Sequence, residues 1–383
     1  MRIALVTPFS PDIGGGSAQL RCHLRDLPEL DVEWHYLATK PAAASHQKWK
    51  WLGGRLSFGD LIGDLSARTG FLPGSKSCAR QVVEQIQADL YWVVGHYEGI
   101  CMAAELCDQG KPVHLTVHDD PFGTWQRSRR YRWFQPLLNA TFPKLLRHAR
   151  SIDVTSWGMR NLYRQKYGVN CFSLYLHVPA LPQLQIAPDP NRLTVGHIGT
   201  LYSLEPFLRF FNACKQVAAE EKRRLRVVCI GSSPELDGLA KGNPEIFESY
   251  GDLSEGAAVP LLAACDLLYV MYPPGGKYEL FRRTSLPIKL ATYVQAQRPV
   301  FTHSPTDSGL ARIVGPAGVG CVCSSEEENG IASKVRDIVH CAVPRESFEA
   351  LRQELMGLRQ VEQLRAALCG ERWQEFPENN FRS

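Results

Sequence analysis

Short, continuously apolar runs alternate with helical patterns along the chain, and this alternation restricts the fold more than any other feature of the sequence. The runs are too short for helices and end in glycine, proline or polar residues, so they predict buried strands. In the first half, strands are expected over 3–6, 32–37, 90–94 and 113–117, and helices over 17–27, 77–87 and 99–107. Ser17 is the expected cap of the first helix, and residues 41–75 have no regular pattern. Strands that alternate with helices are typical of a parallel sheet covered on both faces.

The same rhythm starts again in the second half. Strands are expected over 193–198, 225–230, 246–250, 267–271 and 299–302, and helices over 204–220, 259–264 and 287–296. The proline-rich stretch 178–190 is the expected linker. The predicted fold class is therefore α/β, with two doubly wound, Rossmann-like domains over 1–180 and 190–345. Two such domains face each other across a cleft in several enzyme classes, and the same arrangement is expected here. A stripe of apolar residues predicts a C-terminal helix within 346–383; its members are Leu351, Leu355, Leu358, Val361 and Leu364.

Composition excludes several classes of protein. The 383 residues suit two domains of about 150–200 residues each. The 43 basic and 39 acidic residues leave a formal charge of +4, which is too small an excess to predict a nucleic-acid partner. The 12 cysteines are scattered, and Cys321 and Cys323 have no second pair nearby, so no metal site is expected.

The chain is expected to be a soluble cytoplasmic protein. Its most apolar long run, Val259 to Tyr272, is interrupted by Asp266 and is shorter than the ~20 residues of a membrane-spanning helix. The N-terminus opens directly on a strand rather than on a leader, and the cysteines are then expected to be reduced thiols. Contact with the inner face of a membrane stays open as an additional property.

The loop after the first strand contains a run of three glycines, Gly14, Gly15 and Gly16. Their amides can point at a phosphate beside a helix N-terminus, which favours negative charge. The run lacks the spacing of a dinucleotide-binding fingerprint, and no Walker lysine follows it. A flexible turn and a phosphate- or acceptor-binding loop are both open interpretations.

Two histidines come directly after predicted strands. His96 follows the strand 90–94, and His118, with Asp119 beside it, follows the strand 113–117. A histidine can orient or deprotonate a hydroxyl near neutral pH, and a carboxylate can hold its tautomer. Each histidine alone is most simply a residue bonded to a nearby carbonyl. Two of them in successive strand-end loops favour a functional site, with His118 and Asp119 as candidate catalytic residues.

A basic and aromatic segment follows; its arginines are Arg127, Arg129, Arg130 and Arg132, interleaved with Tyr131, Trp133 and Phe134. A solvated face is the plainest interpretation of this segment. Anionic lipid headgroups or a phosphorylated acceptor are alternative partners. A single patch without a nucleic-acid-binding fold is weak support for nucleic acid.

In the second half, small residues follow two predicted strands: Gly199 with Thr200, and Gly231 with Ser232. They would let a bulky ligand approach the backbone. Further on, three features of an expected helix start suit a diphosphate. They are a proline at the first position of the helix, a hydroxyl before it and a lysine one turn in. The candidate ligand residues of this segment are Arg282, Arg283, Ser285, Lys289 and Thr292. An ordinary capped helix with surface basic residues is the alternative.

In combination, these motifs resemble the retaining GT-B glycosyltransferases of the family 4 type. The resemblance spans nearly the whole chain, through "RIALVTPFSPDIGGGSAQL", "PVHLTVHDDP", "LTVGHIGTLY" and "SLPIKLATYVQAQRPVFT" in that order. It implies transfer of a sugar from a nucleoside-diphosphate sugar to the hydroxyl of a glycan, a lipid-linked or a small-molecule acceptor. It also implies that no divalent metal or other cofactor is needed, because basic groups and helix termini neutralise the leaving phosphate.

The resemblance assigns roles to particular residues. His118 is expected near the transferred sugar, the glycine loop near phosphate or acceptor, and Lys289 with Ser285 near the diphosphate. The donor is expected mainly on the C-terminal domain and the acceptor on the N-terminal one. The last ~30 residues are expected to return to the first domain, as in that family.

The sequence departs from the family pattern at two places. No basic pair follows Gly199, with Arg282 or Arg283 as the expected substitutes. Threonines, Thr284 and Thr292, stand where the family has glutamates, and a hydroxyl holds a ribose diol more weakly than a carboxylate does. Two alternatives stay open for these reasons: a glycosyltransferase-like module that binds without catalysis, and a non-hydrolysing sugar-nucleotide epimerase. The epimerase would need clustered acidic groups for proton transfer, and the sequence shows none.

Overall fold

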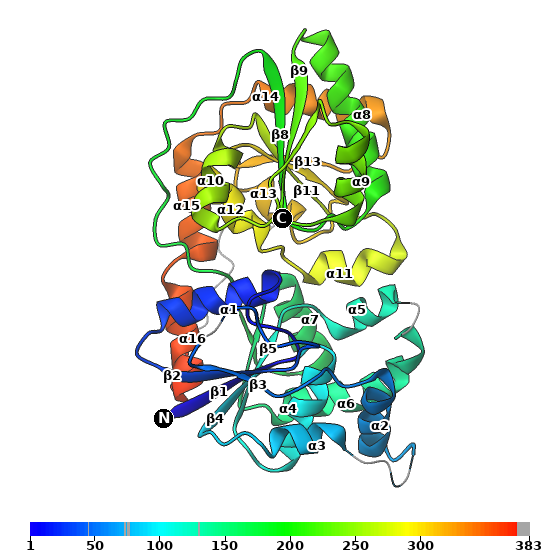
Figure 1. The fold of residues 1–383 in the computed structure, drawn as a ribbon, viewed down its shortest axis with the longest axis vertical. Helices are drawn as coiled ribbons and strands as arrows, with labels where there is room; N and C mark the ends of the chain where they lie inside the picture. The colour runs from blue at the N-terminus through cyan, green and yellow to red at the C-terminus, as the bar shows by residue number, and fades with distance from the viewer. Residues whose placement is uncertain (45, 73, 75–76, 129–130, 374–383) are drawn as a thin grey trace. The chain divides into compact units, whose positions relative to one another are not determined.

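The structure is a computed structural model, and it describes residues 1–44, 46–72, 74, 77–128 and 131–373. The chain divides into two compact units. The first holds residues 1–177, 283–285 and 358–373, and the second holds residues 178–282 and 286–357. Figure 1 shows that each unit is a sheet with helices on both faces.

The first unit is built on a seven-stranded sheet of order β3-β2-β1-β4-β5-β6-β7, and every adjacent pair of strands is parallel. The strands are β1 (Arg2–Thr7), β2 (Asp31–Tyr36), β3 (Trp49–Trp51), β4 (Leu90–Val94), β5 (Val113–Val117), β6 (Ser151–Val154) and β7 (Phe172–Ser173). All residues of β4 and β5 are buried, which explains the continuous apolar run of β4; the buried residues of β5 include His114 and Thr116.

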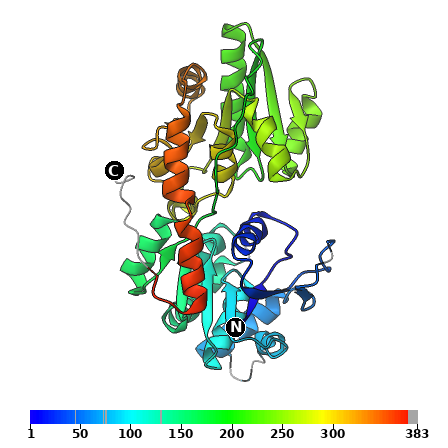
Figure 2. The same ribbon diagram turned by 90° about the vertical axis from the view of Figure 1, so that its left-hand side faces the viewer.

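The helices of the first unit are α1 (Gly15–Asp26), α2 (Phe58–Thr69), α3 (Cys78–Val83), α4 (Glu98–Asp108), α5 (Pro121–Arg127), α6 (Gln135–His148), α7 (Trp157–Tyr167) and α16 (Arg359–Cys369), with a 3-10 turn at Arg132–Phe134. One core joins α1 and α16 to the sheet, where Leu20, Leu364 and Leu368 pack with Leu5 and Trp92. Figure 2 shows α16, in red, lying along the first unit.

The second unit is built on a six-stranded parallel sheet of order β10-β9-β8-β11-β12-β13. The strands are β8 (Arg192–Ile198), β9 (Arg224–Ile230), β10 (Phe247–Ser249), β11 (Leu267–Met271), β12 (Val300–His303) and β13 (Gly320–Cys323). The helices are α8 (Leu204–Glu220), α9 (Pro234–Gly242), α10 (Glu255–Ala263), α11 (Glu279–Thr284), α12 (Lys289–Ala296), α13 (Ala311–Val314), α14 (Glu328–Val339) and α15 (Arg345–Met356), with a 3-10 turn at Gly276–Tyr278. In its core, the Phe210 ring of α8 stacks on Tyr269 of β11 with centroids 4.2 Å apart.

The predicted fold class is confirmed, and three local predictions are wrong. Ser17 does not cap α1: Gly14 is the N-cap, and the Ser17 hydroxyl lies inside the helix and donates to Ser10 O at 2.6 Å. Residues 41–75 are not irregular throughout, since they hold β3 and α2. The C-terminal stripe forms two helices, because the chain turns out of helical geometry at Gly357 (φ −76°, ψ 174°).

Residues 283–285 belong to the first unit because they pack at the start of α7. The Ser156 hydroxyl donates to Thr284 O at 2.5 Å. A Cβ on Gly158 would lie 2.1 Å from Arg283 O, so only glycine allows this contact.

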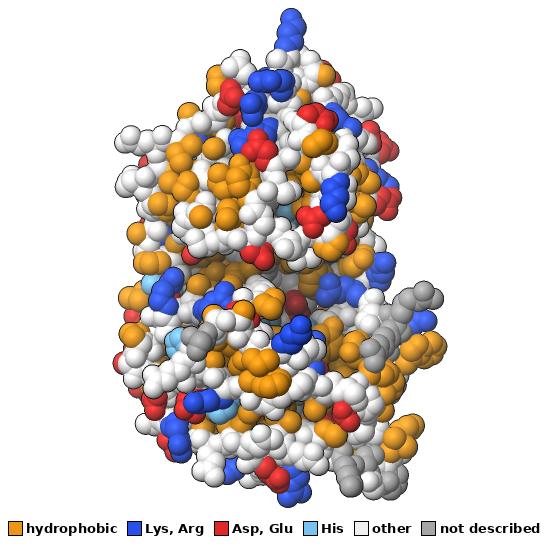
Figure 3. Space-filling view, viewed as in Figure 1, with side chains coloured by type: hydrophobic (Ala, Val, Ile, Leu, Met, Phe, Trp, Pro, Cys, Tyr) orange, Lys and Arg blue, Asp and Glu red, His pale blue; other side chains and the backbone are white. Residues whose placement is uncertain are grey.

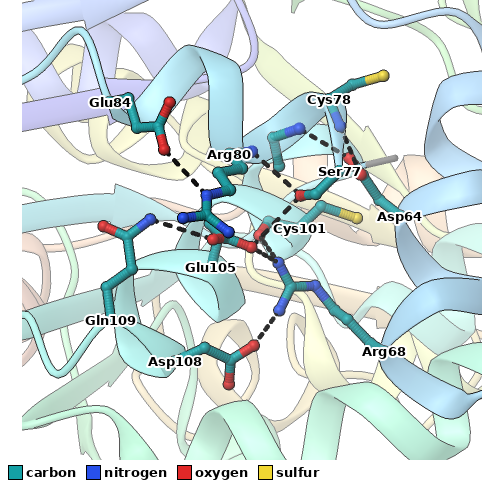
Figure 4. Close-up of polar contacts among 11 residues, drawn as sticks. Asp64, Arg68, Ser77, Cys78, Arg80, Glu84, Cys101, Glu105, Asp108 and Gln109 are labelled. Carbon is teal, nitrogen blue, oxygen red and sulfur yellow. Dashed lines mark hydrogen bonds and ion pairs between the residues drawn. The ribbon is translucent and has the colours of Figure 1, made fainter. Parts of the chain in front are cut away.

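An ion-pair network ties α2, α3 and α4 together (Figure 4). Arg68 of α2, which is largely buried, pairs with Glu105 of α4 at 2.7 Å and with Asp108. Asp64 of α2 accepts from the backbone N–H of Cys78 at 2.8 Å and so caps α3. Burial raises the pKa of Glu105, but hydrogen bonds from Gln109 and Arg68 outweigh it and hold that pKa below its usual value.

No helix within the described ranges is long and apolar enough to cross a membrane.

On the face of the second unit drawn in Figure 3, Lys and Arg side chains are interspersed with Asp and Glu rather than gathered in one basic field. Two of the arginines of the basic segment, Arg129 and Arg130, lie outside the described residues.

Candidate functional site

Each sheet has a topological switch point, where successive strands turn to opposite sides. In the first unit it lies between β1 and β4, and in the second between β8 and β11. Ligands of open α/β sheets bind outside the carboxyl ends of the strands at such points. The loops after these strands are where the sequence places the glycine runs, His96 and Gly199.

In the first unit, the glycine loop and His118 come together. Gly14 is the N-cap of α1 with φ +88°, a conformation that favours glycine. A Cβ added to Gly16 would lie 2.9 Å from His118 Nδ1. Phe9, from the same loop, stacks on the His118 ring with centroids 6.4 Å apart. Gly16 and Phe9 therefore fix the position of the His118 ring.

The environment of His118 keeps its imidazole neutral near pH 7. Burial lowers the pKa of His118, against the opposing charges of Asp153 and Asp119. Its Nε2 is buried and has no hydrogen-bond partner among the described residues. A neutral imidazole with an unused nitrogen can bind or deprotonate a substrate hydroxyl.

His96 lies beside the same group of residues. Its ring packs edge-on against Tyr97 with centroids 4.2 Å apart, and burial lowers the pKa of His96 to about 4. Tyr97 has φ +43°, which is strained for a residue with a side chain. The close turn from β4 into α4 requires Gly99, since a Cβ there would lie 1.9 Å from Val94 O. This turn brings His96 to the edge of the sheet.

Asp119 and Ser285 are hydrogen-bonded, although 166 positions separate them in sequence. The Ser285 hydroxyl donates to Asp119 Oδ1 at 2.7 Å. The structure therefore groups Ser285, which the sequence assigned to the donor diphosphate, with the candidate catalytic residues of the first unit.

In the second unit, two glycines allow the loops after β8 and β9 to touch. Gly199 has φ +75° and Gly231 has φ +91°. A Cβ on Gly231 would lie 3.2 Å from the backbone of Gly199. Thr200 and Ser232, directly after them, are exposed at this edge. The two loops thus leave backbone open to a ligand at the switch point.

Lys289 lies at the same edge. The expected helix start is wrong: α12 begins at Lys289 rather than at Pro287, with Ile288 as its N-cap and no side-chain cap. The Lys289 Nζ donates to Thr200 O at 2.9 Å and lies 5.5 Å from the centre of the Tyr202 ring. Burial lowers the pKa of Lys289 to about 7. Among the described residues no carboxylate pairs with Lys289, so at this helix N-terminus it would gain from an anion, which would restore its charge.

Other predicted ligands of this segment are placed differently. Arg282 is held by Asp307 through two hydrogen bonds of 2.7 and 2.9 Å, and also donates to Gly275 O. This pairing argues against the expectation that Arg282 takes the place of the basic pair that is absent after Gly199. Arg283 is exposed, and Thr292 lies half-buried one turn after Lys289.

Sequence reasoning missed Tyr202 and Tyr272, whose rings stack beside Lys289 with centroids 5.6 Å apart. Tyr202 stands in the loop after β8, but a single tyrosine there matches no spaced motif. Among the residues that the structure describes, no three His, Cys, Asp or Glu side chains come together as a metal site would require.

By sequence, no protein-family model and no curated protein matches the chain. By structure, it resembles several solved proteins over nearly its full length. Anabaena HepE, in complex with UDP, has 15% identity and a TM-score of 0.62, with 97% of this chain and 100% of that chain covered. Sucrose-phosphate synthase from Thermosynechococcus elongatus has 12% identity and a TM-score of 0.68, with 97% and 98% covered. WaaG, a glycosyltransferase involved in lipopolysaccharide biosynthesis, has 12% identity and a TM-score of 0.60, with 96% and 100% covered.

These similarities confirm the fold. The chain has the GT-B fold of the glycosyltransferases, with a doubly wound sheet in each unit.

Proposed function

We propose that the protein is a retaining glycosyltransferase that moves a sugar from a nucleoside-diphosphate sugar to an acceptor hydroxyl. The observation that carries the proposal is the edge formed by Gly199, Gly231 and Lys289 at the switch point of the second unit. It combines open backbone, a helix N-terminus and a buried amine that pairs with no carboxylate in the part of the chain that the structure describes, and together these suit a diphosphate.

The departing diphosphate would be stabilised by the Lys289 ammonium and by the first amides of α12. Such groups stabilise charge that develops in the transition state, and they can do so without a divalent metal. UDP is the first nucleotide to test, because the similar Anabaena HepE is described in complex with UDP.

In this proposal the first unit supplies the groups at the reacting centre. His118, whose Nε2 has no hydrogen-bond partner within the described ranges, would contact the transferred sugar, and Asp119, held by Ser285, would act beside it. His96 and the loop Gly14–Gly16 would contact the acceptor or a phosphate. Thr200, Ser232, Thr292, Arg282 and Arg283 are proposed as further donor contacts, with Arg282 held by Asp307.

The acceptors that fit the fold are a glycan, a lipid-linked or a small-molecule hydroxyl, in glycan or polysaccharide biosynthesis. The proposed location is the cytoplasm. A lipid-linked acceptor would bring the protein to the inner face of a membrane.

The test measures nucleotide release from a panel of sugar nucleotides by the full chain. We expect release with at least one donor, and a loss of at least ~100-fold in His118→Ala, a typical contribution of a general acid-base or electrostatic group. His340→Ala is the matched control, since His340 is exposed and pairs with Glu221 at 2.8 Å. Unchanged release in His118→Ala would remove His118 from the mechanism.

A binding module without activity is the second candidate. It is favoured by Thr284 and Thr292 at positions where glutamates would hold the donor. Under that alternative, nucleotide would bind at Lys289, but no donor in the panel would be turned over.

A further inference from the structure

A cavity of about 300 Å³ lies within the second unit, at the carboxyl edge of its sheet. It is formed by the start of α8 and by the loops that follow β11, β12 and β13, where Glu205, Tyr272, Ser304 and Glu326 line it. The proposed function assigns it no role. Its volume is at the lower end of the range for small-molecule sites, which suits one sugar ring rather than a whole nucleotide.

The cavity adjoins the Lys289 site through a pair of tyrosines. Tyr272 lines the cavity and stacks on Tyr202, with centroids 5.6 Å apart and an angle of 14° between the rings. Tyr202 in turn lies 5.5 Å from Lys289 Nζ. Phe281 contacts both tyrosine rings edge-on, at 5.4 and 5.3 Å, and so holds the pair in place. The stacked tyrosines therefore connect the Lys289 site to the wall of the cavity.

The charges in the cavity disfavour a second anion. Arg209 donates to Glu205 at 2.6 Å and to Glu326 Oε2 at 3.3 Å, so two carboxylates share one guanidinium. His303 adds no charge at neutral pH, because burial lowers its pKa and its ring nitrogens contact Tyr269 and Ser325. The excess of one negative charge would repel a phosphate or a carboxylate.

The same groups suit a neutral ligand that is rich in hydroxyls. The side chains of Glu205 and Glu326 are largely exposed, so each carboxylate keeps lone pairs that can accept hydrogen bonds from sugar hydroxyls. Three prolines, Pro206, Pro274 and Pro305, line the cavity with Tyr272 and offer apolar surface to the C–H face of a ring.

We propose that this cavity takes the sugar group of the donor and selects a neutral sugar over an acidic one. The proposal rests on the proposed function, since it needs a diphosphate at Lys289. It assigns Glu205 and Glu326 as specificity-determining residues.

The test compares UDP, UDP-glucose and UDP-glucuronate by calorimetric titration of the full chain. We expect wild type to bind UDP-glucose at least ~10-fold tighter than UDP-glucuronate, because a carboxylate facing like charges costs that much or more. In the double variant Glu205→Gln with Glu326→Gln this ratio falls to about threefold or less, because the repulsion is gone. Glu327→Gln is the control: it is an exposed carboxylate on the same segment and does not line the cavity.

The outcomes separate the two proposals. The inference is supported if UDP binds wild type and the double variant equally, and if the ratio of the affinities for UDP-glucose and UDP-glucuronate falls only in the double variant. A ratio that the double variant leaves unchanged overturns it while the proposed function stands. Weaker binding of UDP itself in the double variant also overturns it, because the cavity would then hold the nucleoside. If UDP, UDP-glucose and UDP-glucuronate all fail to bind wild type, the proposed use of UDP-sugars fails and the inference with it.

Discussion

At the residue scale, the contact between Gly16 and His118 leaves no room for a methyl group at position 16. A Cβ there would lie 2.9 Å from His118 Nδ1, so Gly16→Ala must displace the ring or the loop. We expect turnover to fall by about 10- to 100-fold, the range for a catalytic group misplaced by about 1 Å. Affinity for UDP is expected to stay unchanged, since the diphosphate site belongs to the second unit. Steady-state kinetics and calorimetric titration check both.

Gly63→Ala is the matched control for this change. Gly63 lies within α2, and a Cβ there would meet nothing within 4 Å. The substitution is expected to stabilise the protein by about 0.5–1 kcal/mol and leave turnover intact. Full turnover in Gly16→Ala would contradict the proposed role of the His118 position.

The lowered pKa of Lys289 predicts that nucleotide binding depends on pH. Its pKa of about 7 leaves roughly half of the amines neutral at pH 7, whereas a diphosphate binds the ammonium form. Binding therefore takes up about half a proton at pH 7 and nearly one at pH 8.5, and affinity falls by up to ~10-fold per pH unit above 7. Calorimetry in buffers of different ionisation enthalpy measures the uptake. A binding enthalpy that is independent of buffer at pH 8 would contradict a diphosphate at Lys289.

Strand-end position predicted which residues gather in the second unit, and side-chain pairing could not be predicted. Gly199 and Gly231 come together because parallel strands end at one edge, whereas Lys289 was singled out by its place near an expected helix start. The pairing of Arg282 with Asp307 joins residues from separate loops, and no periodicity marks it. The same is true of Ser285 and Asp119, whose contact depends on how residues 283–285 pack against the start of α7.

At the scale of elements, the network around Arg68 holds three helices to one another (Figure 4). Arg68 and Glu105 are each about nine-tenths buried, with 11% of each side chain exposed. Arg68→Met would leave the Glu105 carboxylate without its cation. We expect a loss of about 3 kcal/mol in the free energy of unfolding, the usual cost of breaking a buried pair on one side. Urea denaturation measures it.

Arg80→Met is the corresponding surface change. Arg80 of α3 pairs with Glu84, the residue that follows the end of α3, and both side chains are more than half exposed. No measurable loss of stability is expected there. Equal losses in the two variants would show that burial does not decide the strength of these pairs.

Elements that are buried on both sides were predicted best, and short or exposed ones were not. The limits of β4, β5 and β11 agree with the sequence pattern, because apolar residues fill β4 and β11 from end to end and alternate with the buried His114 and Thr116 in β5. The edge strand β3 has half-exposed and exposed residues and no such pattern. The break at Gly357 was missed because the apolar stripe continues through Leu358, whose side chain the structure leaves exposed.

At the scale of the whole molecule, the two sheets share one winding order, in which the chain adds strands on one side and then on the other. The alternation of strands and helices predicted two doubly wound units, since that pattern allows little else. It did not predict that residues 358–373 join the first unit, because membership depends on tertiary contacts of Leu364 and Leu368. The resemblance led only to the expectation that the last ~30 residues return to the first domain.

The central claim is that the second unit binds a nucleoside diphosphate at Lys289. The most direct measurement is thermal denaturation of wild type and Lys289→Met with UDP, GDP, ADP or TDP. We expect UDP at ~100 times its Kd to stabilise wild type by about 2.7 kcal/mol and so raise its Tm, with little effect on Lys289→Met. If none of the four nucleotides raises the Tm of wild type, the claim is contradicted.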